Sequence, residues 1–150
     1  MSEKRNQFEE MIEEFLALKK YPEDVLTDPI ATGKWSIREI VGHLFYWDKF
    51  SLEKMVPLMI HEATLPPFPN HDLHNEEGIS YINRYDSVND IIDEFAKTRK
   101  QLVEELRKLN NDIRFNIGHE SNTYSCERYV DVFLHHDNDH LNQIKEKLNC

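Results

Sequence analysis

The sequence contains few glycines for a protein of its length. Only four occur in 150 residues, at Gly33, Gly42, Gly78 and Gly118. A strand-rich protein needs glycine and other turn residues at short intervals, so this scarcity argues against a β-rich fold. Apolar residues recur mostly three and four positions apart, which is the spacing of amphipathic helices. We therefore expect an all-α protein.

The chain is also short of positive charge. It holds 18 lysines and arginines against 28 aspartates and glutamates, a net charge of -10. Such a chain repels nucleic acids and anionic membranes unless its basic residues cluster, and the strongest cluster is Lys19-Lys20. No apolar run approaches the roughly 20 residues that span a bilayer. The first residues, Met-Ser-Glu-Lys-Arg, lack the apolar core of a secretory signal. We expect a soluble, cytoplasmic protein that binds neither nucleic acid nor membrane.

Several common site signatures are missing. Cys126 and Cys150 are too few and too far apart for a disulfide framework, and we expect a small buried thiol and a frayed terminal one. There is no glycine-rich phosphate loop and no nucleophile elbow. The paired Glu-x-x-His motifs of di-iron bundles are absent as well.

Four segments carry a helical apolar period: residues 3–20, 36–61, 87–109 and 125–148. The second begins with a capping box, in which Ser36 and Glu39 can each satisfy a backbone N–H of the other. Pro57 is expected to kink the end of this helix, because proline removes one N–H and clashes with the preceding turn.

The second and third helices are separated by a long, proline-containing stretch. Residues 62–86 are expected to form a loop with a short helix near residues 76–81, and loops of this length are usually functional or mobile. The pattern as a whole predicts a single domain, residues 1–150, folded as an up-down four-helix bundle with a long connection between helices 2 and 3.

Three histidines lie on apolar helix faces. His136 and His140 are four residues apart, so both imidazoles can reach the same ion from one face of the last helix. His43 lies among apolar residues of the second helix. A buried, unpaired imidazole costs about 1–3 kcal/mol, and a divalent cation removes that cost by accepting the lone pairs. The alternative is that these rings bond tyrosine, aspartate or backbone groups.

Other polar residues near these histidines have alternative roles. His135 points about 100° away from His136 and is expected at the surface or as an outer partner. Asp137 and Asp139 either orient an imidazole N–H or are solvated, and we expect the latter. Arg99 is either a clamp for an anionic group or a surface residue. The remaining histidines are expected in solvated loops, with the first two of the following at a possible rim of the site: His71, His74, His61 and His119.

Two motifs resemble those of a known family. Residues 33–44, GKWSIREIVGHL, are similar to the helix-two motif of the DinB/YfiT-like superfamily, and residues 136–144, HDNDHLNQI, are similar to its helix-four motif. The resemblance implies a four-helix bundle and a three-histidine site at His43, His136 and His140 that holds a divalent ion, usually nickel or zinc. It also implies a homodimer.

The resemblance leaves three functions open. The first expectation is a metal-dependent, thiol-dependent S-transferase that uses a low-molecular-weight thiol such as bacillithiol with a small-molecule substrate. The second is a metal-dependent hydrolase, which needs a general base such as His71 or Asp48. The third is a non-catalytic, stress-linked binding bundle whose metal is structural or absent.

Overall fold

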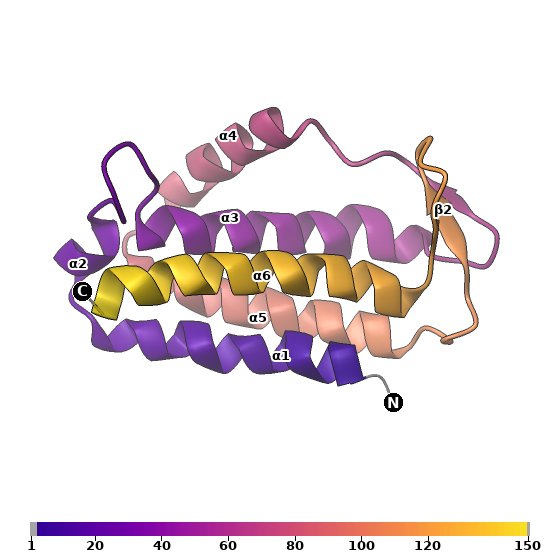
Figure 1. The fold of residues 1–150 in the computed structure, drawn as a ribbon, viewed down its shortest axis with the longest axis horizontal. Coiled ribbons are helices and arrows are strands. Elements are labelled where there is room, and N and C mark those ends of the chain that lie inside the picture. The colour runs from indigo at the N-terminus through magenta and orange to yellow at the C-terminus, as the bar shows by residue number, and fades with distance from the viewer. Residues whose placement is uncertain (1–2, 150) are drawn as a thin grey trace.

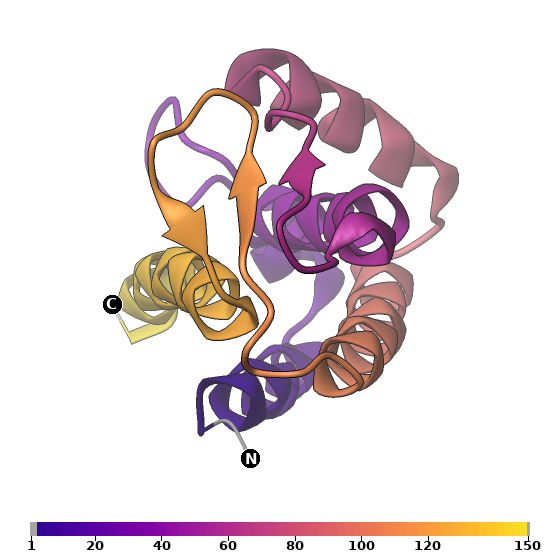
Figure 2. The same cartoon turned by 90° about the vertical axis from the view of Figure 1, so that its right-hand side faces the viewer.

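Four long helices pack side by side in the computed structural model, which describes residues 3–149 (Figure 1). They are α1 (Glu3–Leu16), α3 (Ile37–Phe50), α5 (Val88–Arg107) and α6 (Cys126–Asn149). Seen along the bundle, they surround a common core (Figure 2), in which the Phe15 and Phe95 rings meet edge to face at 5.0 Å. The predicted four-helix bundle is confirmed.

Shorter elements connect these helices. They are a 3₁₀ turn at Ala17–Lys20, α2 (Glu23–Thr27), a π-helical turn at Ser51–Met55, a 3₁₀ turn at Val56–Leu58, β1 (Thr64–Leu65), α4 (His71–Tyr81), a 3₁₀ turn at Ile82–Arg84, β2 (Phe115–Ile117) and β3 (Thr123–Tyr124).

The long connection sets the direction of the helices. The chain runs one way in α1 and the other way in α3, and it also reverses between α5 and α6 (Figure 1). Between α3 and α5 it returns along α4, so α3 and α5 run in the same direction. Both therefore end at the same end of the bundle, where the strands lie.

The second helix begins as predicted and ends earlier. Ser36 Oγ accepts a hydrogen bond from the Glu39 N–H at 3.2 Å, and Glu39 Oε1 accepts one from the Ser36 N–H at 3.0 Å. The α-helix stops at Phe50 rather than running to residue 61, because a π turn at Ser51–Met55 and a 3₁₀ turn around Pro57 replace it. Ser51 Oγ shares a 2.7 Å hydrogen bond with the Tyr129 hydroxyl inside this turn.

A small sheet closes one end of the bundle and was not predicted. Its order is β1-β2-β3, with β1 parallel to β2 and β2 antiparallel to β3. Leu65 lies opposite Ile117, and Phe115 lies opposite Tyr124. All four of these side chains are buried, so the sheet extends the core beyond the helix ends.

The connection between α3 and α5 is more ordered than predicted. Helix α4 begins at His71, five residues before the expected start, because the Asn70 side chain caps it by accepting a hydrogen bond from the Leu73 N–H. Gly78 allows α4 to lie close to α3, since a Cβ there would come within 3.0 Å of the Tyr46 ring. One face of α4 therefore packs against α3.

The structure also bears on the predictions about the two cysteines and about membrane-spanning helices. Cys126 is buried, as expected, whereas Cys150 lies outside the described residues. Within residues 3–149, no helix has both the length and the apolar character needed to cross a bilayer.

Candidate metal centre

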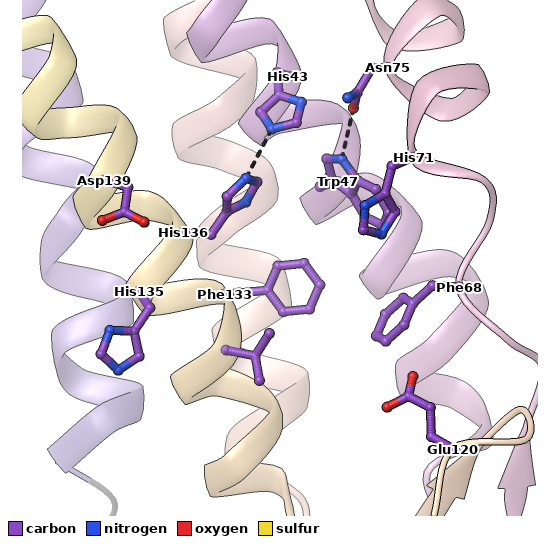
Figure 3. A pocket seen from close by; sticks show the side chains of 11 residues that line it. His43, Trp47, Phe68, His71, Asn75, Glu120, Phe133, His135, His136 and Asp139 are labelled. Carbon is purple, nitrogen blue, oxygen red and sulfur yellow. Dashed lines mark hydrogen bonds between the residues drawn. The ribbon is translucent and has the colours of Figure 1, made fainter. Parts of the chain in front are cut away.

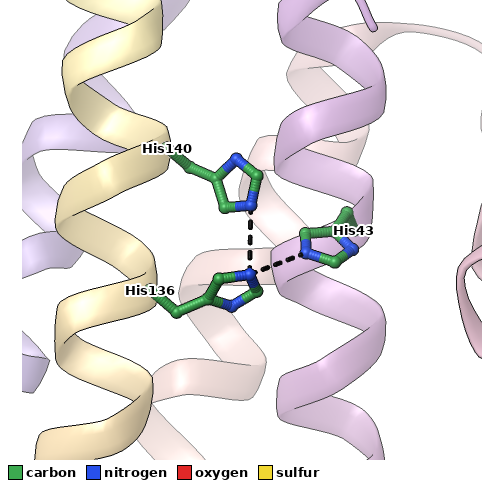
Figure 4. Close-up of side chains that lie close together, drawn as sticks. All are labelled: His43, His136 and His140. Carbon is green, nitrogen blue, oxygen red and sulfur yellow. Dashed lines mark hydrogen bonds between the residues drawn. The ribbon is translucent and has the colours of Figure 1, made fainter. Parts of the chain in front are cut away.

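Three imidazole rings converge between α3 and α6 (Figure 4). The Nε2 atom of His136 lies 3.4 Å from Nε2 of His43 and 3.2 Å from Nε2 of His140. In the group formed by His43, His136 and His140, the facing nitrogens all lie within 4.8 Å of one another. The structure therefore brings together the three histidines that the sequence selected.

Hydrogen bonding between the rings cannot satisfy this arrangement. A neutral imidazole nitrogen carries either one proton or one lone pair, so Nε2 of His136 forms at most one good N–H···N bond with its two neighbours. His140 Nδ1 lies 3.1 Å from Gln143 Oε1. Because that oxygen accepts, the proton belongs on Nδ1, and Nε2 of His140 presents a lone pair to the other two rings.

The three rings resist protonation. Burial, together with the neighbouring imidazoles, lowers the pKa of His43 to about 3 and that of His136 to about 4. The pKa of His140 is also lowered by burial, against the opposing effects of Gln143 and Asp139. The rings are therefore neutral near pH 7, which is the form that binds a metal ion.

These residues fit a divalent cation. A tetrahedral ion with Zn–N bonds of about 2.0–2.1 Å places its ligand nitrogens roughly 3.3–3.4 Å apart. The observed separations of 3.4 Å and 3.2 Å from the central nitrogen agree with that spacing. Three imidazoles leave at least one coordination position open, which is typical of catalytic rather than structural zinc sites.

His43 and His136 line a pocket of about 520 Å³. Helix α4 forms one wall and α6 the opposite one, with aromatic side chains between them (Figure 3). The lining residues are His43, Trp47, Phe68, His71, Asn75, Glu120, Val132, Phe133, His135, His136 and Asp139. His140 instead faces a smaller hollow beside Trp35 and Gln143. A ligand in the larger pocket thus meets His43 and His136.

The predictions for the surrounding histidines are only partly correct. His71 and His135 are exposed and line the pocket, so both belong to its rim. His74 was expected in solvent, but it is buried against Trp47, with ring centroids 4.1 Å apart. His61 accepts a hydrogen bond from the Arg114 N–H and does not line the pocket, and neither does His119.

A buried ion-pair cluster lies beside the site and corrects three predictions. Arg99 was expected as a surface residue or an anion clamp, yet it is 0% exposed. Its Nε and Nη2 donate to Asp48 at 2.7 Å and 3.1 Å, and its Nη1 lies 2.9 Å from Asp137. Asp137 is therefore not solvated, and Asp48 is not a base at the rim. Sequence reasoning missed this cluster because its members are far apart in the chain.

The cluster ties all four helices together at the level of the histidines. Arg99 comes from α5, Asp48 from α3 and Asp137 from α6, next to His136; Arg99 Nη1 also donates to the backbone oxygen of Phe8 in α1 at 2.9 Å. Burial raises the pKa of both carboxyl groups, that of Asp137 to about 7, and the Arg99 charge opposes this rise.

Acid is expected to destabilise the metal-free protein through the same histidines. Since burial lowers their pKa values, the unfolded chain binds more protons than the folded one below about pH 6.5, and stability falls as the pH is lowered. For His43, whose pKa drops from 6.5 to about 3, the loss at pH 5 is about 2 kcal/mol. Urea unfolding of EDTA-treated protein at pH 7.5 and pH 5 measures it. A His43→Gln variant should show a flatter profile, and an equal slope would contradict the assignment.

Comparisons with known proteins agree with this architecture. The model of the DinB superfamily matches residues 7–144, while no curated protein is a significant sequence match. The chain is similar in structure to YfiT from Bacillus subtilis, described as a probable metal-dependent hydrolase with an unusual four-helix bundle topology. The TM-score is 0.70 at 16% identity, over 98% of this chain and 87% of that one. Because the family model spans nearly all of the described helices, this chain belongs to the DinB superfamily.

Proposed function

We propose that this protein is a metal-dependent hydrolase of small molecules, with a nickel or zinc ion held by His43, His136 and His140. The observation that carries the proposal is the convergence of three neutral imidazole nitrogens, two of them from residues that line a pocket, His43 and His136. An ion with such ligands acts as a Lewis acid and lowers the pKa of a water or thiol that joins it. The description of YfiT supports the same class of reaction.

The chain's own residues supply the rest of the site. Trp47, Phe68 and Phe133 form an apolar wall that excludes water from one side of the pocket. His71 is exposed on the α4 side of the pocket, with its ring centroid 5.5 Å from that of Trp47, and it is close enough to His136 to lower the pKa of His136. We assign His71 the role of general base, which Asp48 cannot fill because it is paired with Arg99 inside the bundle.

A thiol-dependent S-transferase is the second candidate. The same ion would activate a low-molecular-weight thiol as readily as water. Hydrolysis ranks first because of the charge of the pocket lining. Among the residues that the structure describes, this lining contains two carboxylates, Glu120 and Asp139, and neither lysine nor arginine. Bacillithiol carries carboxylates of its own, which such a lining would repel. A non-catalytic bundle is the third candidate, and a homodimer remains our expectation for the assembly.

One assay distinguishes these candidates. Protein stripped with EDTA and reloaded with zinc or nickel is tested on a panel of activated esters and amides, with and without bacillithiol. The hydrolase account expects metal-dependent turnover without thiol. Turnover only with thiol would replace it with the transferase, and a fully loaded protein inactive in both assays would favour a non-catalytic bundle.

The role of His71 makes a separate prediction. Loss of a general base typically costs about 10²–10⁴-fold in rate, so His71→Gln is expected to lower kcat by such a factor. Because His71 is not among the converging nitrogens, metal content and KM should change little. His119→Gln, which alters an exposed histidine outside the pocket, serves as the control. An unchanged kcat in His71→Gln would remove His71 from the mechanism.

A further inference from the structure

The pocket beside the histidines has an uneven charge. Glu120 reaches it from the loop between β2 and β3, and Asp139 reaches it from α6. Both side chains are exposed, and the lining contains no lysine or arginine among residues 3–149. The Tyr124 hydroxyl holds Glu120 in place by donating to its Oε1 at 2.7 Å. Arg128 lies over the Tyr124 ring, 5.5 Å from its centroid, and stays outside the pocket.

Three aromatic rings form the apolar part of the same pocket. The ring centroids of Trp47, Phe68 and Phe133 lie 6.1 to 6.3 Å from one another. Phe133 reaches this group from α6, and Phe68 reaches it from the other side of the pocket (Figure 3). Aromatic faces attract organic cations within about 6 Å through the ring quadrupole. The aromatic rings and the carboxylates therefore favour the same ligand charge.

The floor of the pocket also has an unmet polar atom. His43 is only 5% exposed, and its Nδ1 has no hydrogen-bond partner among the described residues. The nearby Asn75 Oδ1 on α4 already accepts a hydrogen bond from Trp47 Nε1 at 3.2 Å. When Nε2 binds the ion, Nδ1 carries the proton and is a donor, so this atom calls for an acceptor and does not bear on the charge of the ligand.

From this combination we infer that the pocket selects substrates with an apolar or aromatic body and a cationic amino or quaternary ammonium group. The body packs against Trp47, Phe68 and Phe133, and the cation lies between the rings and the carboxylates of Glu120 and Asp139. Catalysis on such a substrate rests on the proposed hydrolase function, whereas the charge preference rests on the pocket lining alone. The protein lining by itself disfavours anionic ligands of the same size by like charge, whereas a bound divalent ion would attract them.

Ligand binding can be measured apart from catalysis. Trp47 lines the pocket, and Trp35 is the other of the two tryptophans, so Trp35→Phe leaves Trp47 as the fluorescent reporter. Zinc-loaded and EDTA-treated protein are titrated at pH 8 with benzyltrimethylammonium, benzyl alcohol and phenylacetate. Benzyltrimethylammonium has no lone pair and cannot bind the ion directly. For the EDTA-treated protein, a contact worth about 1–2 kcal/mol predicts that benzyltrimethylammonium binds about tenfold more tightly than benzyl alcohol, with phenylacetate weakest. The zinc-loaded protein shows how far a bound ion, which attracts a carboxylate, changes that order.

Paired carboxylate variants test the source of the preference. The double variant Glu120→Gln with Asp139→Asn should reduce the preference for benzyltrimethylammonium over benzyl alcohol to within about threefold. That remainder is the contribution of the aromatic rings. Glu10→Gln with Glu13→Gln on α1 removes the same charge from exposed positions outside the pocket and should leave the preference intact. In the EDTA-treated protein, equal binding of all three ligands, or tighter binding of phenylacetate, would overturn the inference. So would a full preference in the Glu120/Asp139 double variant. A protein that binds the cation but neither takes up a metal ion nor hydrolyses any substrate would reject the proposed function and leave this inference standing.

Discussion

Replacing His136 by alanine is expected to abolish tight metal binding and, with it, hydrolysis. His136 is the central ring of the group, since its Nε2 lies 3.4 Å from that of His43 and 3.2 Å from that of His140. Loss of an outer partner of a metal ligand already costs about 10–100-fold in affinity, so loss of this ligand should cost more than about 100-fold. Isothermal titration with zinc or nickel, together with elemental analysis, measures the change.

His135→Ala is the matched control for this experiment. His135 is the adjacent residue of α6, but its side chain is 78% exposed and lies 3.7 Å from Asp131. Its removal should leave metal affinity within about threefold, because a solvated neighbour contributes little. Circular dichroism checks that both variants fold. Equal metal affinity in the two variants would show that the ion, if bound, is held elsewhere.

Replacing Arg99 by methionine is expected to destabilise the fold more than any surface substitution. The change leaves Asp48 and Asp137 buried without their cation, and breaking a buried ion pair in this way costs about 3–5 kcal/mol. Arg99→Lys should be intermediate, because lysine keeps the charge but cannot reach Asp48 with two nitrogens while bonding Asp137 and the Phe8 carbonyl oxygen. Urea unfolding gives the free-energy change for each.

The control for Arg99 lies on the same helix. Arg107 also pairs with a carboxylate, Glu9 at 3.0 Å, but its side chain is 28% exposed. Arg107→Met should therefore cost at most about 1 kcal/mol. If Arg99→Met were as mild, Arg99 would not be the element that joins α3, α5 and α6 beside the histidines.

Local patterns made the helices and the histidine pair predictable. The capping box at Ser36 and Glu39 depends on residues three apart, and it appears in the structure with both hydrogen bonds. His136 and His140 share one face of α6 because of helical spacing alone. His43 needed more than spacing, since its approach to His136 spans 93 residues of chain. Its place in the site came mainly from the family resemblance.

Long-range packing explains what the sequence did not reveal. Arg99 finds Asp48 across 51 residues, and no local pattern separates such a buried arginine from a solvated one. The strands are two or three residues long, too short for an alternating apolar pattern. The π turn that follows α3 contains Ser51, which is hydrogen-bonded to Tyr129, 78 residues away in the chain. In each case, partners distant in sequence override the local propensity.

The central claim is that His43, His136 and His140 hold one divalent ion, and an anomalous difference map from zinc- or nickel-loaded crystals tests it most directly. The account predicts one strong peak between α3 and α6, about 2.0–2.2 Å from Nε2 of all three rings. A loaded protein whose peak lies away from these rings, or touches only one of them, would contradict it.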